Sequence, residues 1–133
     1  MLELEEIQSR GFKNVSEGGK ITGFQVPVRL TTYRGLYLSQ LSEATVTVNG
    51  EKFAGDQVTW IIHGKSYLQK DLQNISDVHW SPLEPAIFKV NKPGGLKLGL
   101  YDVEVAFGYS QSYIPSVEWS PITTYKRKIT LAS

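Results

Sequence analysis

Hydrophobic and polar residues alternate along most of the chain, which is the pattern of β-strands with one buried face. The segment 21–30 begins this pattern, with four apolar side chains on one side: Phe24, Val26, Val28 and Leu30. Pro27 lacks an N–H for a sheet ladder, so we expect this strand to lie at a sheet edge or to carry a bulge. The glycines of SEGG at 16–19 predict a hairpin loop between this strand and the preceding segment 12–15.

Tight turns are expected at two dipeptides, each of which separates two alternating segments. Asn49-Gly50 supplies the positive φ angles of a type I′ hairpin turn, after a strand that buries Ala44, Val46 and Val48. His63-Gly64 follows a strand that buries Val58, Trp60 and Ile62. The apolar spacing then lengthens between Leu68 and Ile75, which predicts a single helical turn.

The glycine-rich stretch NKPGGL at 91–96 could be interpreted as a phosphate-binding loop or as a chain reversal. A phosphate-binding P-loop needs its lysine after the glycines and a helix behind it, whereas Lys92 precedes them and an alternating segment follows. We therefore predict a turn, because Pro93 presets φ and Gly94-Gly95 tolerate positive φ. A long strand should follow over 98–109, with Asp102 and Glu104 facing water.

The remaining strands complete the fold prediction. Ala86, Phe88 and Val90 alternate in one strand, and the last strand over 123–131 has four residues on one side: Tyr125, Arg127, Ile129 and Leu131. About eight or nine short strands at this spacing are typical of sandwiches and barrels. We predict a single all-β domain over 1–133, an antiparallel β-sandwich of immunoglobulin-like or jelly-roll type. Two long segments, 31–41 and 110–121, are the candidate functional loops.

Composition narrows the possible partners. The 133 residues include 14 Lys plus Arg and 13 Asp plus Glu, so no strong field would attract nucleic acid. The basic cluster 126–128 alternates with apolar residues and fits a solvated strand face. Cysteine is absent, which excludes disulfides and thiolate sites. The N-terminal residues lack a secretory pattern, and no run approaches the ~20 apolar residues of a membrane span, so we expect a soluble cytoplasmic protein.

Candidate chemistry is sparse. The two histidines, His63 and His79, favour surface or packing roles, because a ligand or base would need further partners. The loops instead carry aromatic rings and prolines: Tyr33, Tyr37, Trp80, Tyr113 and Trp119, with Pro82, Pro115 and Pro121. Exposed rings suit protein interfaces and equally suit stacking against sugars. The alternative is that these rings cap the open ends of the core.

The order of these features resembles the small β subunit of bacterial C-glycoside deglycosidases. The matching motifs are FKNV, GFQVPVRL, TYRGLYLS, TVTVNGEKF, VTWIIHGKSY, FKVNKPGGLKLGLYDVEVAF and SYIP. They cover nearly the whole chain, and their order is more specific than any one of them.

The resemblance implies a hetero-oligomer. In this family the small subunit pairs with a larger TIM-barrel α subunit that carries a divalent metal, usually taken as Mn²⁺. The complex cleaves the carbon–carbon bond between a 3-oxo sugar and an aromatic, flavonoid-type aglycone, so the chain would belong to a lyase but hold no catalytic residue or metal itself. We expect the substrate cleft or subunit interface to use seven residues: Tyr33, Arg34, Gly35, Tyr113, Ile114, Pro115 and Trp119.

Two other functions stay open at this point. A carbohydrate-binding module would use Trp80, Trp119 and Tyr113 as stacking platforms. An independent metalloenzyme would need a metal ion held by His63 and His79.

Overall fold

The structure is a computed structural model that describes residues 6–30, 36–75, 77–81, 84–108 and 123–131. Most of these residues form two antiparallel sheets. The five-stranded sheet has the order β1-β2-β9-β6-β7, with bounds Lys13–Glu17, Lys20–Val28, Ala86–Asn91, Val58–Ile62 and Lys65–Leu68. The four-stranded sheet has the order β11-β10-β4-β5, with bounds Thr123–Leu131, Gly99–Phe107, Thr45–Val48 and Glu51–Phe53.

Shorter elements connect these strands along the chain. A two-stranded sheet pairs β3 (Leu36–Tyr37) with β8 (His79–Trp80). Three 3-10 helices complete the described part: η1 (Leu38–Gln40), η2 (Gly55–Gln57) and η3 (Gln69–Asn74). The helical turn expected between Leu68 and Ile75 is confirmed by η3. None of these described helices is long and apolar enough to span a bilayer.

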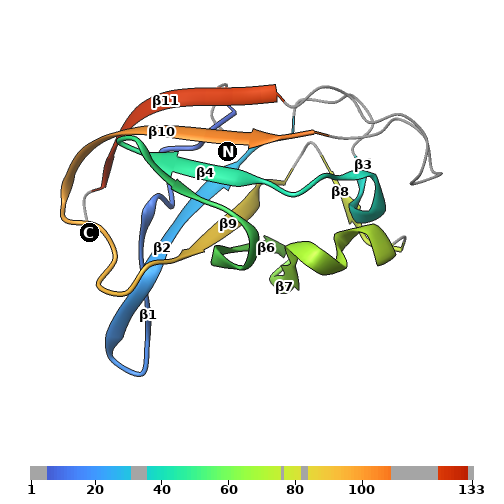
Figure 1. Cartoon of the computed structure of the whole chain (residues 1–133), viewed down its shortest axis with the longest axis horizontal. Coiled ribbons are helices and arrows are strands. Elements are labelled where there is room, and N and C mark those ends of the chain that lie inside the picture. The colour runs from blue at the N-terminus through green and yellow to red at the C-terminus, as the bar shows by residue number, and fades with distance from the viewer. Residues whose placement is uncertain (1–5, 31–35, 76, 82–83, 109–122, 132–133) are drawn as a thin grey trace.

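The two large sheets lie face to face (Figure 1), which confirms the predicted β-sandwich. Aromatic rings of the two sheets contact one another between them. Phe24 of β2 lies edge-on to Phe53 of β5 with centroids 5.5 Å apart. Trp60 of β6 contacts Phe107 of β10 in the same way at 5.8 Å. The described residues contain more strands than the eight or nine expected, because β3 and β8 have only two residues each and leave no alternation in the sequence.

Alternation correctly identified the core-facing side chains. Four residues that the pattern placed inward are completely buried: Phe24, Val26, Val46 and Trp60. In β11, Ile129 and Leu131 are buried while Lys126 and Lys128 are exposed. Burial of apolar area at about 25 cal/mol per Å² is the main stabilising contribution to such a core.

The backbone angles confirm the type I′ turn predicted at Asn49-Gly50 and the turn predicted at His63-Gly64. Asn49 and Gly50 have φ of 48° and 88°, and His63 and Gly64 have φ of 54° and 77°. Asn49 also extends the sheet, because its N–H donates to the Asp102 carbonyl and its Oδ1 accepts from the Asp102 N–H. The turn residue therefore joins β4 to β10 beyond the end of their ladder.

The stretch 91–96 is a turn, as predicted. The Gly95 N–H donates to the Lys92 carbonyl at 2.8 Å, and both glycines have positive φ. Asn14 of β1 fixes the turn by donating to the Leu96 carbonyl and accepting from the Leu96 N–H. The Lys92 ammonium lies 3.2 Å from Glu51 and 5.7 Å from the Phe53 ring centroid, so its charge is used within the fold.

The expectation that Pro27 marks an edge strand is wrong, because β2 lies between β1 and β9. The β1 ladder ends at the Lys13–Gln25 pair, and beyond it the Pro27 carbonyl accepts from the Gln8 N–H at 2.9 Å. The Pro27 nitrogen therefore points to the β1 side of β2, beyond the last pair of the β1–β2 ladder, so no ladder hydrogen bond is lost there. The alternative expectation, that this strand carries a bulge, is borne out by a register shift at Thr22, which is the extra residue between the Ile21 and Gly23 pairs.

The β1–β2 hairpin is tied to β9 by an exposed ion pair. The Lys89 ammonium donates to Glu17 Oε1 at 2.6 Å. This hydrogen bond, followed by the charge of Lys89, lowers the pKa of Glu17 below its ordinary value of 4.5. Because the Glu17 carboxylate is largely exposed to water, we expect the pair to add little to the free energy of unfolding.

Candidate functional site

The seven residues expected to contact substrate or partner lie outside the described residues: Tyr33, Arg34, Gly35, Tyr113, Ile114, Pro115 and Trp119. Their roles stay a prediction. The described residues that flank these two segments show where on the sandwich each segment leaves the fold.

Both segments leave the fold at one end of the sandwich. Segment 31–35 leads directly into β3, whose Leu36 pairs with Trp80. Segment 109–122 follows Gly108, whose N–H donates to Ser42 Oγ at 2.6 Å and whose carbonyl accepts from the Ser42 N–H at 2.9 Å. Ser42 closely follows β3 and η1 in the chain. We call this region, formed by residues 36–42, 78–80 and 108, the β3–β8 end; in Figure 1, β3 and β8 lie far from the β1–β2 hairpin.

Trp80 belongs to the core at this end, so its interpretation as an exposed loop ring is wrong. Its side chain is completely buried, with the ring centroid 5.7 Å from that of Trp60 and 5.8 Å from that of Phe107. The indole N–H donates to the Glu84 carbonyl at 2.9 Å, which satisfies its polar atom. The alternative that such rings cap the core is correct for Trp80.

Gln69 is a buried residue next to the same aromatic core, and no sequence pattern pointed to it. Its Nε2 donates to the carbonyls of Ala44 at 2.9 Å and Gly55 at 3.1 Å. Its Oε1 accepts from the Trp60 indole N–H at 2.9 Å and from the Ala44 N–H. No alternation marks this residue, because its partners are mainly backbone atoms brought together by the fold.

The surface of the β3–β8 end carries a partly exposed aromatic pair. Tyr37 lies edge-on to His79 with ring centroids 5.0 Å apart, and the two residues are register partners in β3 and β8. The Gln40 side chain accepts from the Tyr37 N–H at 2.9 Å and fixes the start of η1. Tyr37 is the one ring of the predicted aromatic group that the structure describes at this surface.

A shallow hollow of about 360 Å³ lies beside this pair. Its lining combines charged, polar and aromatic side chains: His63, Lys65, Tyr67, Asp77, Val78, His79 and Ser81. His63 Nδ1 lies 2.7 Å from Glu84 Oε2, and its Nε2 lies 2.9 Å from the His79 carbonyl oxygen. Both ring nitrogens are therefore used within the protein.

The described residues of this chain do not fit a metal ion. No three His, Asp or Glu side chains among them are grouped as a ligand set. His63 has no ring nitrogen left to coordinate a metal, since each faces an oxygen of Glu84 or His79. His63 is therefore not available as a metal ligand, which argues against an independent metalloenzyme built on the two histidines.

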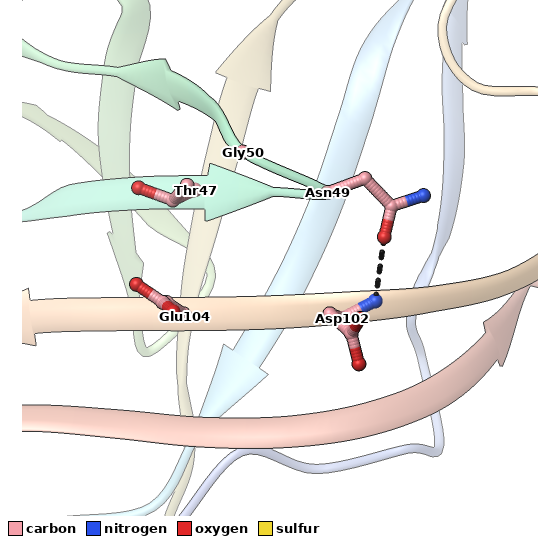
Figure 2. Close-up of a pocket in the computed structure, with 5 residues that line it drawn as sticks. All are labelled: Thr47, Asn49, Gly50, Asp102 and Glu104. Atoms are coloured by element: carbon pink, nitrogen blue, oxygen red, sulfur yellow. Dashed lines mark hydrogen bonds between the residues drawn. The ribbon is translucent and has the colours of Figure 1, made fainter.

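A second hollow, of about 450 Å³, lies on the outer face of the four-stranded sheet. Figure 2 shows the Thr47 and Glu104 side chains on neighbouring strands, with the Asn49 amide reaching the Asp102 backbone. The Lys126 Nζ lies 3.5 Å from Glu104 Oε1, and the Lys128 Nζ lies 3.7 Å from Asp102 Oδ1. The two carboxylates face water as predicted, and each is balanced by a lysine, as in an ordinary solvated strand face.

Comparison with known proteins matches this chain to one family. The family model for the C-glycoside deglycosidase beta subunit matches residues 2–113. A protein of Eubacterium cellulosolvens named C-glycoside deglycosidase beta subunit is 42% identical over 117 residues, which is 87% of this chain and 80% of that protein. The residues matched by the family model include β1 to β10, the turns at 49–50 and 63–64 and the β3–β8 end. The resemblance seen in the sequence motifs is thereby confirmed, and the chain belongs to the C-glycoside deglycosidase beta subunit family.

Proposed function

We propose that this chain is the non-catalytic beta subunit of a heteromeric deglycosidase. The complex would cleave the carbon–carbon bond between a 3-oxo sugar and an aromatic, flavonoid-type aglycone. The partner would be a larger TIM-barrel α subunit that holds a divalent metal ion, expected to be Mn²⁺. The match to a beta-subunit family over residues 2–113 is the observation that carries this proposal.

The proposed cleavage reaction begins with removal of a proton from the sugar, and it would benefit from a subunit that keeps water out of the cleft. A 3-oxo group acidifies the proton on C2 of the sugar, so a base can remove it and the aglycone carbon can leave after protonation. We assign the base and the metal to the partner. This chain would then cover one side of the partner's cleft and help to exclude water, which strengthens the electrostatic interactions inside.

We assign the covering surface to the β3–β8 end. The two segments with the predicted contact residues join the sandwich there, at Leu36 and Gly108. The buried rings of Trp60, Trp80 and Phe107 lie beneath, and they form a rigid support for whatever the end presents. Tyr37 adds a partly exposed ring next to the first segment.

A carbohydrate-binding module is less well supported. Trp80, one of its three proposed stacking platforms, is completely buried and its indole N–H is already bonded to Glu84. Trp60 is completely buried as well. A saturable change of tryptophan fluorescence on adding polysaccharide to the chain alone would nevertheless favour this rival.

The proposed function is tested by expressing the chain with and without the α subunit and measuring cleavage of a 3-oxo-C-glucoside. We expect turnover from the complex and none from the 133-residue chain alone. Within the complex, Arg34→Ala and Tyr113→Ala should each weaken assembly or turnover by about tenfold, or about 1.4 kcal/mol. Lys52→Ala, which removes an exposed charge on β5, is the matched control and should change neither. Turnover by the isolated chain would refute the assignment of the catalytic groups to the α subunit. Unchanged assembly and turnover in both Arg34→Ala and Tyr113→Ala would refute the assigned surface.

A further inference from the structure

The strand β11 is the longest outer strand of the described sandwich. It forms one edge of the four-stranded sheet (Figure 1), and its nine residues pair with β10 from end to end. The other outer strands of the two large sheets, β1, β5 and β7, have five, three and four residues. An edge strand presents N–H and C=O groups to a further strand, and proteins commonly keep such edges short. Among the described residues, no strand pairs with the second edge of β11.

The hydrogen bonds of β10 show which backbone groups of β11 face this open edge. The Asn49 N–H donates to the Asp102 carbonyl, so the even-numbered residues of β10 bond toward β4. The bonding direction alternates along an antiparallel strand, so the odd-numbered residues bond toward β11. Their register partners in β11 are also odd-numbered, since Val103 pairs with Arg127. The N–H and C=O groups that face the open edge therefore belong to four even-numbered residues: Thr124, Lys126, Lys128 and Thr130.

Two of these four residues place positive charge beside the open edge. The Lys126 and Lys128 side chains are 70% and 61% exposed. Their Nζ atoms lie 3.5 Å from Glu104 and 3.7 Å from Asp102, which are their register partners on β10. Such exposed pairs are weak, so each ammonium group stays available to a second carboxylate on its other side.

The same two lysines disfavour pairing with a second copy of this chain. A symmetric antiparallel pair of β11 strands joins even-numbered residues to even-numbered residues, because those have the outward backbone groups. A pair centred on residue 127 places Lys126 opposite Lys128 of the other copy, and a pair centred on 126 or 128 places a lysine opposite itself. Like charges directly opposite each other are destabilising. The edge therefore excludes its own copy and favours an acidic strand.

The two faces of β11 define the side chains that an added strand would need. On the outer face it would lie beside Lys126 and Lys128, where carboxylates complete a row of alternating charge across three strands. On the inner face it would lie beside Ile129 and Leu131, which are buried and apolar. Acidic residues alternating with apolar residues fit both faces.

We propose that the β11 edge binds an extended acidic segment of the partner subunit, which continues the four-stranded sheet by one strand. This inference rests on the proposed function, which supplies the partner. β11 begins where Thr123 pairs with Phe107, next to Gly108 of the β3–β8 end. The edge is therefore continuous with the surface assigned to the α subunit. Backbone hydrogen bonds provide the binding, and the alternating side chains provide the specificity.

Hydrogen exchange of the β11 amides, in the isolated chain and in the complex with the α subunit, tests this proposal. In the isolated chain, the N–H groups of the four even-numbered residues should exchange quickly, whereas those of Tyr125 and Arg127 should exchange slowly because they bond to β10. In the complex, the even-numbered N–H groups should slow by about tenfold or more.

Two results would overturn the proposal. A complex that turns over substrate but leaves the even-numbered amides unprotected would refute the added strand and leave the proposed function intact. Slow exchange of the same amides in the isolated chain would show that the chain itself, or a second copy, already occupies the edge. Failure of the complex to form or to turn over substrate would refute the proposed function, and with it the partner on which this inference rests.

A charge exchange within the sheet tests the acidic character of the bound segment. The double variant Glu104→Lys with Lys126→Glu keeps opposite charges on two register partners but reverses the charge beside the edge. Its Tm should stay within about 2 °C of the natural value, because the exposed pair is preserved. Its assembly with the α subunit should weaken by about tenfold, because carboxylates would then face carboxylates.

The control is Lys52→Glu, on the opposite edge strand of the same sheet. Lys52 is exposed and pairs in register with Thr47, so this variant reverses an edge charge away from β11. We expect normal assembly from it. Equal assembly by the double variant and the natural chain would refute an acidic segment, and equal weakening by the double variant and Lys52→Glu would refute the β11 edge as the place where it binds.

Discussion

Gln69 illustrates how a single polar side chain can determine the arrangement of an apolar core. Its amide donates to the Ala44 and Gly55 carbonyls and accepts from the Trp60 indole N–H, so it links η3 to η2, to β6 and to the residue before β4. The side chain is 4% exposed, so water cannot replace these partners. A buried amide with all its bonds made stabilises one arrangement against slipped alternatives.

We predict that Gln69→Glu lowers the free energy of unfolding by about 2 to 4 kcal/mol. The carboxylate would place an oxygen opposite the Ala44 and Gly55 carbonyls and would bring a charge into the core. Gln57→Glu is the matched control, because Gln57 is exposed and uses only its Oε1, which accepts from the Ala54 N–H at 3.3 Å. Urea denaturation measures both; equal effects of the two substitutions would contradict the role given to Gln69.

Strands and turns were predictable because their signals are local. Alternation located the residues that β6, β9 and β11 bury, and Asn49-Gly50 and His63-Gly64 identified the hairpins through the φ angles they permit. The β3–β8 pair was not predicted, because a strand of two residues is too short to show an alternation of apolar and polar positions. The position of β2 within its sheet was also missed, because Pro27 lies where the neighbouring ladder has ended, and that end depends on the packing of residues 6–9.

The candidate site was less predictable than the fold. Segments 31–41 and 110–121 stood out by length and aromatic content, but only tertiary structure shows that Leu36 and Gly108 lie at the same end of the sandwich. The contact of His63 with Glu84 joins residues from a hairpin turn and a later loop, and neither residue type nor spacing indicates it. Trp80 was misassigned for the same reason, since its burial comes from Trp60 and Phe107.

At the element scale, the turn at 92–95 allows two kinds of glycine requirement to be separated. Gly94 and Gly95 both have positive φ, but a Cβ on Gly94 would meet nothing within 4 Å. A Cβ on Gly95 would lie 2.4 Å from Asn14 Oδ1 and 2.6 Å from Ile21 Cγ2. The first glycine is thus required by conformation alone, and the second also by close packing against β1 and β2.

We predict that Gly94→Ala lowers the free energy of unfolding by about 1 to 2 kcal/mol, the usual difference for an L-residue in the left-handed region. Gly95→Ala should be worse by at least a further ~1 kcal/mol, because Asn14 must move and its two bonds to Leu96 weaken. Chemical denaturation of the two variants side by side measures the difference. Equal losses would mean that the turn moves as a unit and that Asn14 does not pin it.

At the scale of the whole molecule, the two ends of the sandwich have different construction. The end with the β1–β2 hairpin and the 92–95 turn is fastened by contacts within the chain, such as Asn14 with Leu96 and Glu17 with Lys89. The β3–β8 end carries the short pair β3–β8, and there the two segments with predicted contact residues join the fold. A short two-stranded pair is marginally stable by itself, so a partner bound there would stabilise it most.

This asymmetry gives a prediction for hydrogen exchange in the isolated chain and in the complex with the α subunit. The Leu38 and Ser39 N–H groups donate to the carbonyls of Val78 and Ile75, so they report on the opening of the β3–β8 end. We expect their exchange to slow by about tenfold or more in the complex, because the partner must dissociate before this end can open. The Leu96 N–H, bonded to Asn14 at the other end, serves as the internal control and should exchange at the same rate in both states. Slowing confined to Leu96 and its neighbours would place the partner on the hairpin end, and the surface assigned here to the α subunit would then be wrong.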